Sequence, residues 1–294
     1  MAEFRYHVVD VFTTMPLEGN ALAVFPDASG IDDVTMQRVA REMNLSETTF
    51  ILPEESRDDS TRVRIFTPAR ELPFAGHPTI GTAYVMRMLG IAAAGAKRFV
   101  LHENVGRVPI RVDDGDDPIL WLTTPPITKL GAFQAEACAR ALSLSSDRLV
   151  ASVPCEQLSA GAPLIFVALK DRTAVDDAEV DSTAFAGLMR ESKTPSPIFV
   201  FAATERGAYS RMFAPVLGIV EDPATGGATG PLAAFMMAHG LVGRSDGTRF
   251  VSEQGVKMGR RSLLHVLVHG EGGKEGIEVG GNVVPIASGT MRLP

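Results

Sequence analysis

The amino-acid sequence predicts an α+β protein made of two pseudo-symmetric halves, each a strand-rich, barrel-like sheet around one central helix. Three observations lead to this fold class. A pattern of residues occurs twice, once in each half of the 294-residue chain. Runs of β-branched and aromatic residues outnumber helical patterns, and each copy of the repeat leads into one long helical segment. A repeat at this distance indicates a duplicated domain, because the periods of solenoid repeats are far shorter.

The repeat spans residues 64–83 and residues 211–233, and both copies read as a strand, a turn, a Gly-rich corner and a helix. The loop before the corner is longer in the second copy. The recurring pairs are Arg64 and Arg211, Phe66 and Phe213, Pro68 and Pro215, Glu71 and Glu221, Pro73 and Pro223, Gly76 and Gly226, Thr79 and Thr229, and Ala83 and Ala233. We call residues 71–79 the first corner and residues 221–229 the second corner.

In the first half, strands are expected at residues 4–12 and 21–25. The helix that follows has one apolar face, can be capped by Asp32 or Asp33, and has a plausible end at Asn44. A β-branched and apolar run then predicts an inner strand at residues 48–52.

Glu47 lies at the mouth of that inner strand, between a helix end and apolar neighbours. Most glutamates in such places are exposed, so its position alone favours no function. A strand at residues 63–66 leads into the first corner. His77 and Pro78 then open a helix that ends at Gly90. Further strands are expected at residues 98–101, 108–112 and 119–123.

Thr124, Pro125 and Pro126 mark the expected boundary, which gives halves at residues 1–126 and 127–284. A flexible hairpin loop is expected at residues 270–276. Helices in the second half are predicted at residues 134–142, 181–190 and 230–239, and strands at 164–169, 198–202, 209–213, 249–254, 263–268 and 277–284.

Composition limits the functions to consider. Hydrophobic residues make up 45% and charged residues 21% of the chain, as in ordinary globular proteins. A net charge of −7 with scattered basic residues argues against a nucleic-acid-binding surface. The N-terminus does not resemble a signal peptide, and the most apolar stretch is interrupted by Arg87 and too short for a bilayer. We therefore expect a cytoplasmic protein without nucleic-acid or membrane partners.

The two cysteines, Cys138 and Cys155, have no partners at metal-ligand spacing and are too few for a disulfide framework. Buried free thiols are the expectation. No Walker A spacing or dinucleotide fingerprint occurs at either corner, which disfavours nucleotide binding.

Each corner combines backbone and side-chain chemistry. A Gly-rich turn that feeds a helix N-terminus exposes N–H groups and the positive end of the helix dipole, which attract carboxylate or phosphate. His77 and Asp222 add titratable groups, although each could serve only as a turn or capping residue. Two such groups at equivalent corners of a duplicated fold favour a shared site in a cleft between the halves.

The chain resembles the phenazine-biosynthesis PhzF-like family over nearly its whole length. Four motifs in the same order carry the resemblance: VFTTMPLEGNALAVF, AREMNLSETTF, RIFTPARELPFAGHPTIGTA and RMFAPVLGIVEDPATGGATGPLA. The resemblance implies the diaminopimelate-epimerase-like fold with its active site between two similar halves. It also implies a homodimer, and it allows the C-terminal segment 285–294 to return to the first half.

The resemblance implies catalytic roles for three residues. Glu47, in the Leu-Ser-Glu motif, matches the family's acid/base residue, and His77 and Asp222 match further residues of its site. The best-known reaction of the family is the isomerisation of trans-2,3-dihydro-3-hydroxyanthranilate, which moves a proton between ring carbons without a redox or metal cofactor. The remaining predicted substrate-binding residues are Asn20, Gly76, Thr225, Gly226 and Gly227.

Two departures from the family predict changed substrate recognition. The phenazine enzyme has a serine where this chain has Gly227, and its Gly-Pro-Arg-His region is replaced by SAGAPL at residues 159–164. The two-cysteine racemases of the wider fold have thiols at both corners. Here the corresponding positions are Ala75 and either Ala224 or Thr225, so a two-thiol mechanism is improbable.

Three functions stay open at this point. The first is a cofactor-independent isomerase that acts on a small carboxylate-bearing metabolite. The second is an epimerase or racemase that uses Glu47 and Asp222 instead of thiols. The third is a binding protein that kept the cleft and lost turnover.

Overall fold

The computed structural model describes residues 1–57, 60–93, 95–192 and 194–294. The chain divides into two compact units. Unit 1 consists of Met1–Thr123 with Val279–Pro294, and unit 2 consists of Thr124–Glu278. Within the described ranges, no helix is both long and apolar enough to cross a membrane.

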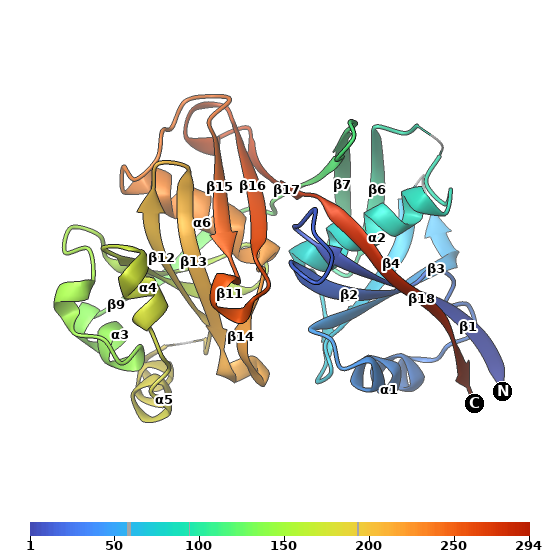
Figure 1. Cartoon of the computed structure of the whole chain (residues 1–294), viewed down its shortest axis with the longest axis horizontal. Coiled ribbons are helices and arrows are strands. Elements are labelled where there is room, and N and C mark those ends of the chain that lie inside the picture. Colours follow the sequence, from blue (N-terminus) through green and yellow to red (C-terminus); the bar gives the residue numbers. More distant parts are fainter. Residues whose placement is uncertain (58–59, 94, 193) are drawn as a thin grey trace. The chain divides into compact units, whose positions relative to one another are not determined.

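Unit 1 is a mixed sheet with two helices (Figure 1). Its strands are β1 (Ala2–Val11), β2 (Asn20–Phe25), β3 (Glu47–Arg57), β4 (Ser60–Phe66), β5 (Glu71–Leu72), β6 (Arg98–Glu103), β7 (Gly106–Asp113), β8 (Ile119–Thr123) and the C-terminal β18 (Val283–Leu293). β18 pairs antiparallel with β1, so the end of the chain belongs to the unit that begins it. The helices are α1 (Asp33–Met43) and α2 (Gly76–Met88).

Unit 2 has the same plan with additional helices. Its strands are β9 (Thr128–Phe133), β10 (Cys155–Ser159), β11 (Pro163–Leu169), β12 (Ile198–Thr204), β13 (Gly207–Ala214), β14 (Ile219–Asp222), β15 (Arg249–Gln254) and β16 (Ser262–His269), and β17 (Gly276–Gly281) spans its end. Its helices are α3 (Ala135–Ala141), α4 (Arg172–Asp177), α5 (Ser182–Glu191) and α6 (Gly226–Ala238).

The strand pairings repeat in order, which is how the duplication is expressed in the fold. In unit 1 the pairings β1–β2, β2–β3, β3–β4, β4–β5, β4–β6 and β6–β7 are antiparallel, parallel, antiparallel, antiparallel, parallel and antiparallel. In unit 2 the pairings from β10–β11 to β15–β16 follow the same succession. The α+β fold class predicted from the sequence is therefore confirmed.

The helices α2 and α6 are the central helices of their units. Buried residues lie on all sides of each, as expected for a helix enclosed by other elements. α2 packs against β1, β2, β3 and β8, and α6 packs against β10, β11 and β16. At Gly81 of α2, an added Cβ would lie 2.6 Å from Leu22 Cδ2, so glycine permits the close approach of helix and sheet.

An arginine–glutamate pair braces each corner. Arg64 donates from Nε and Nη2 to the two carboxylate oxygens of Glu71, both at 2.7 Å. Arg211 binds Glu221 in the same way, both at 2.9 Å. Both guanidinium groups also lie over the phenylalanine two residues later, Phe66 or Phe213. The Arg-x-Phe pattern and the glutamate that recur in the sequence thus form the same ion-paired arrangement in both units.

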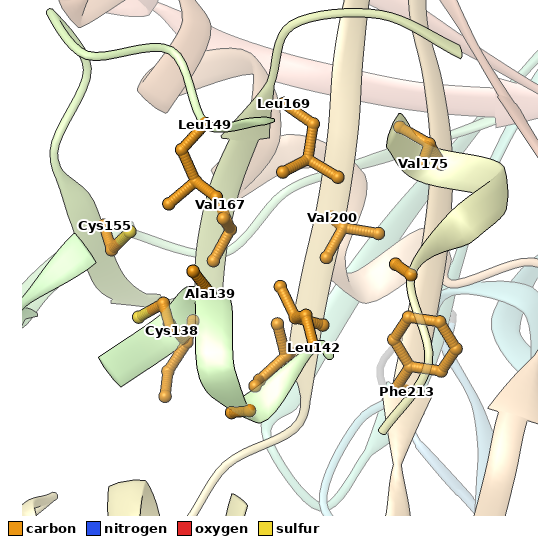
Figure 2. Close-up of a cluster of buried hydrophobic side chains, with 14 of the residues drawn as sticks. Cys138, Ala139, Leu142, Leu149, Cys155, Val167, Leu169, Val175, Val200 and Phe213 are labelled. Atoms are coloured by element: carbon orange, nitrogen blue, oxygen red, sulfur yellow. The ribbon is translucent and has the colours of Figure 1, made fainter. Parts of the chain in front are cut away.

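Cys138 and Cys155 are free and buried, as predicted. They lie in a core cluster of unit 2 with aliphatic side chains such as Leu142, Leu149 and Val167 (Figure 2). The hydrogen bond with Cys155 raises the pKa of the Cys138 thiol, and burial adds to the effect. The two thiols are part of the apolar core of unit 2.

The secondary-structure predictions were wrong in several places. α6 begins at Gly226 and not at residue 230. Two glycines in the first turn disfavour a helix, but the hydroxyl of Thr229 donates to the carbonyl of Thr225 and stabilises that turn. The strand predicted at 277–284 is interrupted at Asn282, whose Nδ2 donates to the carbonyls of Asp117 and Pro118. The strands β9 and β10 were not predicted, and the loop predicted at 270–276 contains a short 3-10 helix, Glu271–Gly273.

Candidate active site

Glu47 is the first residue of β3, where the chain leaves helix α1. The left-handed conformation of Asn44, with φ of 50°, ends the helix and turns the chain into the strand. β3 then pairs in parallel with β2, with Glu47 beside Leu22. The Glu47 side chain is 13% exposed and Thr48 is fully buried, so the carboxylate lies at the margin of the core.

His77 is the second residue of α2 and faces Glu47. Its side chain is 5% exposed, and its Nε2 lies 3.3 Å from Glu47 Oε2. The two atoms are too poorly aligned for a hydrogen bond. Among the residues that the structure describes, none accepts a hydrogen bond from Nε2. A buried imidazole nitrogen thus faces a carboxylate with its hydrogen-bonding capacity unused.

Asn20 determines which nitrogen of His77 carries the hydrogen. Its amide Nδ2 lies 3.2 Å from His77 Nδ1. Nδ2 is a donor, so Nδ1 accepts, and a neutral ring then carries its hydrogen on Nε2. Burial lowers the pKa of His77 to about 3, which keeps the ring neutral at pH 7. The hydrogen therefore lies on Nε2, the nitrogen that is 3.3 Å from Glu47 Oε2.

The second corner has its own hydrogen-bond network. The hydroxyl of Thr225 donates to Asp222 Oδ2 at 2.5 Å. The fully buried Gln254 donates from Nε2 to Thr225 Oγ1 at 3.0 Å and to the Asp222 carbonyl at 2.8 Å. Its Oε1 accepts from the Thr225 N–H at 3.1 Å. Because Thr225 Oγ1 accepts from Gln254, its single hydrogen is left for the Asp222 carboxylate.

The central helices begin without a side-chain cap, as α3 also does, whereas α1, α4 and α5 have one. Aspartates cap α1, α4 and α5 by accepting from a backbone N–H in the first turn. Ala75 and Thr225, at the cap positions of α2 and α6, make no such bond, and neither helix has an acidic residue in its first turn. The N–H groups of a first turn have no partner within the helix. Gly76, Gly226 and Gly227 supply such groups at the two corners.

The predicted site residues thus form one set in each unit. In unit 1, His77 lies next to Gly76 and contacts both Asn20 and Glu47. In unit 2, Asp222 and Thr225 are hydrogen-bonded directly before Gly226 and Gly227. The expectation that both sets serve one cleft remains a prediction.

The departures from the family also have a structural setting. Gly227 is the second residue of α6. Residues 159–164 run from the end of β10 into β11, and the turn between them is closed by Gly161 N–H donating to Ser159 Oγ at 3.2 Å. In the described part of the chain, no three His, Cys, Asp or Glu side chains are grouped as metal ligands.

Sequence reasoning missed two residues that contact the corners. Gln254 ends β15 and Glu103 ends β6, and both are buried. They occupy equivalent positions, because β15 pairs with β13 as β6 pairs with β4. The repeat as recognised in the sequence stops before these strands, so only a longer alignment of the two halves could have indicated them.

A profile of the phenazine biosynthesis-like proteins, PhzC-PhzF, matches residues 9–289. The chain belongs to this family.

Relatives of the chain bear names of the same class. It is 36% identical over 292 residues to the trans-2,3-dihydro-3-hydroxyanthranilate isomerase of Pseudomonas aeruginosa, covering 98% of this chain and 99% of that one. Among solved structures, a phenazine biosynthesis protein of the PhzF family from Bacillus anthracis matches with a TM-score of 0.88 at 24% identity, over 100% of both chains. A predicted epimerase from Pseudomonas aeruginosa matches with a TM-score of 0.85 at 31% identity, over 99% and 100%. The chain is an isomerase of the PhzF type.

Proposed function

We propose that the protein is a cofactor-independent isomerase that shifts a proton on a small carboxylate-bearing substrate, with Glu47 as the acid/base residue. The facing pair of Glu47 and His77 carries the proposal. Glu47 lies at the edge of a dry environment and is still partly exposed, so a substrate can reach it. A carboxylate in this position can take a proton from carbon and return it to another carbon on the same face.

The hydrogen on His77 Nε2 gives the two oxygens of Glu47 different tasks. Oε2 lies 3.3 Å from Nε2 without a hydrogen bond, and we propose that it accepts the Nε2 hydrogen once bound substrate aligns the two groups. The proton that moves between substrate and enzyme then belongs on Oε1. His77 stays neutral throughout and serves as a donor, because its pKa of about 3 lies far below neutral pH.

The reaction separates charge, and the helix starts can offset it. When Glu47 removes a proton from carbon, negative charge spreads over the conjugated substrate. First-turn N–H groups at the corners can bind the substrate carboxylate and stabilise the developing charge. Return of the proton to a second carbon leaves an enol, which becomes a ketone. Asp222, oriented by Thr225, is proposed to orient polar groups of the substrate and to assist the proton movement.

The first substrate to test is trans-2,3-dihydro-3-hydroxyanthranilate, after which the relative from Pseudomonas aeruginosa is named. The protein is incubated with it in D₂O, and NMR follows consumption and deuterium incorporation. Glu47→Gln should abolish turnover with the fold intact. The matched control is Glu55→Gln, because Glu55 lies on the same strand with its side chain 60% exposed. Full turnover by Glu47→Gln would show that Glu47 is not the base.

A thiol-independent epimerase is the second candidate, because a relative 31% identical is named a predicted epimerase. The same experiment separates the two. An epimerase would exchange a single α-proton for deuterium and invert its carbon, without moving a double bond. If the first substrate is not consumed, small chiral carboxylates are screened for this exchange. The homodimer and the cytoplasmic location remain predictions.

A further inference from the structure

Glu103 is a buried carboxyl group that the proposed reaction does not use. It ends β6 and is 1% exposed. Its Oε1 lies 2.6 Å from Thr79 Oγ1, and that oxygen lies 2.7 Å from the carbonyl oxygen of Ala75. Ala75 is the cap residue of α2 and directly precedes Gly76 and His77. A chain of three oxygen atoms thus connects Glu103 to the first corner.

The number of hydrogens available to these three oxygens indicates the protonation state of Glu103. The carbonyl of Ala75 can only accept, and the hydroxyl of Thr79 has one hydrogen. If Thr79 donates it to Ala75, the contact at 2.6 Å needs a hydrogen from Glu103. If Thr79 donates to an ionised Glu103 instead, two buried oxygens meet at 2.7 Å with no hydrogen between them. Thr229, equivalent to Thr79, donates to the carbonyl four residues earlier at 3.0 Å. The first arrangement therefore places a hydrogen in both short contacts, whereas Oε2 of Glu103 has no hydrogen-bond partner among the described residues in either arrangement.

The electrostatic environment agrees with a neutral Glu103. Burial raises the pKa of Glu103 to about 8. The hydrogen bond with the Thr79 hydroxyl and the charge of Arg62 on β4 both lower this pKa, but by less than burial raises it. The carboxyl thus keeps its proton at neutral pH.

The counterpart of Glu103 in unit 2 is an amide, which is always neutral. In the parallel pairing of β13 with β15, Gln254 lies opposite Ser210, and the matching position in β6 is Glu103. Gln254 also contacts the start of its central helix, through Thr225 and the Asp222 carbonyl. A protonated glutamic acid has nearly the shape of a glutamine, and it offers an O–H donor where the amide has two N–H donors, beside one acceptor oxygen.

We propose that Glu103 is a neutral carboxylic acid that donates to Thr79 and acts as a positioning residue for the first corner, as Gln254 does for the second. The expected effect on turnover rests on the proposed function, whereas the protonation state of Glu103 is independent of it.

The protonation state is tested by infrared difference spectroscopy at pH 6 on wild type and Glu103→Gln. A band of a protonated carboxyl group should be present in wild type and absent from the variant. Glu156→Gln is the control, because Glu156 is also buried but is paired with Lys129 at 2.5 Å, and its replacement should leave the band of Glu103 in place. If the wild-type spectrum contains no carboxyl band that disappears in Glu103→Gln, Glu103 is ionised and the proposal is overturned.

The positioning role is tested by turnover and by amide exchange around residues 75–79. Glu103→Gln should keep kcat within about threefold of wild type and leave amide exchange unchanged. Glu103→Leu should lower kcat by about 10- to 100-fold with little change in KM, the range seen for residues that orient catalytic groups. Should Glu103→Leu fail to fold, Thr79→Val removes the same hydrogen bonds and should have the same effect.

Two results would separate this proposal from the proposed function. Equal losses of kcat in Glu103→Gln and Glu103→Leu would overturn the positioning role. If wild type turns over no substrate, the proposed function fails, while infrared spectra and amide exchange still decide the role of Glu103.

Discussion

Nδ2 of Asn20 lies 3.2 Å from Nδ1 of His77, although the two residues are 57 positions apart in the chain. This contact fixes the hydrogen of the neutral ring on Nε2, the nitrogen that faces Glu47. Sequence analysis assigned Asn20 to substrate binding. Its contact with His77 and its exposure of 1% favour a role in orienting the imidazole.

Asn20→Asp should therefore reverse the tautomer of His77. A carboxylate at this position accepts the ring hydrogen on Nδ1, which leaves Nε2 as an acceptor facing Glu47. We expect turnover to fall by about 10²-fold, because misplaced catalytic groups have effects of this size. ¹⁵N NMR of the imidazole reports the tautomer directly. Asn282→Asp, which removes an unrelated amide donor in the same unit, should leave the tautomer of His77 unchanged.

The stability of the protein should fall as pH rises from about 6.5 to 8, with Glu103 as one cause. Its pKa rises from an ordinary value of 4.5 to about 8 on folding, so in this range the folded state keeps a proton that the unfolded state has lost. The slope is about 1.4 kcal/mol per pH unit for one such group. Urea denaturation at pH 6.5 and 8 should show a weaker fall for Glu103→Gln, and an identical fall would contradict this prediction.

Below pH 6.5, His77 acts in the opposite direction. Its pKa falls from 6.5 to about 3 on folding, so the unfolded state binds the additional proton and stability is lost as pH decreases through this range. His77→Gln should lose less stability than wild type between pH 6.5 and 4. His265, whose pKa burial also lowers, provides a comparison: His265→Gln should leave most of the His77 effect in place.

Arg211→Met should destabilise the protein more than Arg64→Met. Arg211 and Glu221 have side-chain exposures of 9% and 11%, whereas Glu71 is 26% exposed. Arg211 also donates from Nη1 to three carbonyls, those of Val175, Asp176 and Ala178. Removing one partner of a buried pair costs about 3–5 kcal/mol. Urea denaturation measures both losses, and equal losses would refute the ranking.

Gly227→Ser should improve binding of trans-2,3-dihydro-3-hydroxyanthranilate. The substitution restores a hydroxyl at the second residue of α6, and one hydrogen bond of about 0.5–1.5 kcal/mol corresponds to a two- to tenfold lower KM. Gly187→Ser, in the interior of α5 where an added Cβ would make only an ordinary contact with Arg190 Nη2 at 3.7 Å, controls for the higher helix propensity of serine. It should leave KM unchanged. An unchanged KM in Gly227→Ser would mean that residue 227 does not determine this specificity.

Much of the fold could be predicted from local sequence signals. Asp32 and Asn44 mark the ends of α1 because capping and left-handed conformations depend on residue type. The repeat predicted two central helices after two corners, since Arg64 with Glu71 and Arg211 with Glu221 build the same brace. The predicted start of α6 was wrong. Gly226 and Gly227 have a low helix propensity, and the hydrogen bonds of Thr225 outweigh it.

The sequence by itself determined the duplication, the fold class, and Glu47, His77 and Asp222 as candidates, because these depend on residue type and order. Only the tertiary structure decided which contacts these side chains make. The tautomer of His77 depends on Asn20, and the positions of Glu103 and Gln254 beneath the helix starts depend on strand pairing. The raised pKa of Glu103 comes from burial. Such properties arise from contacts between residues distant in the chain, which no local pattern records.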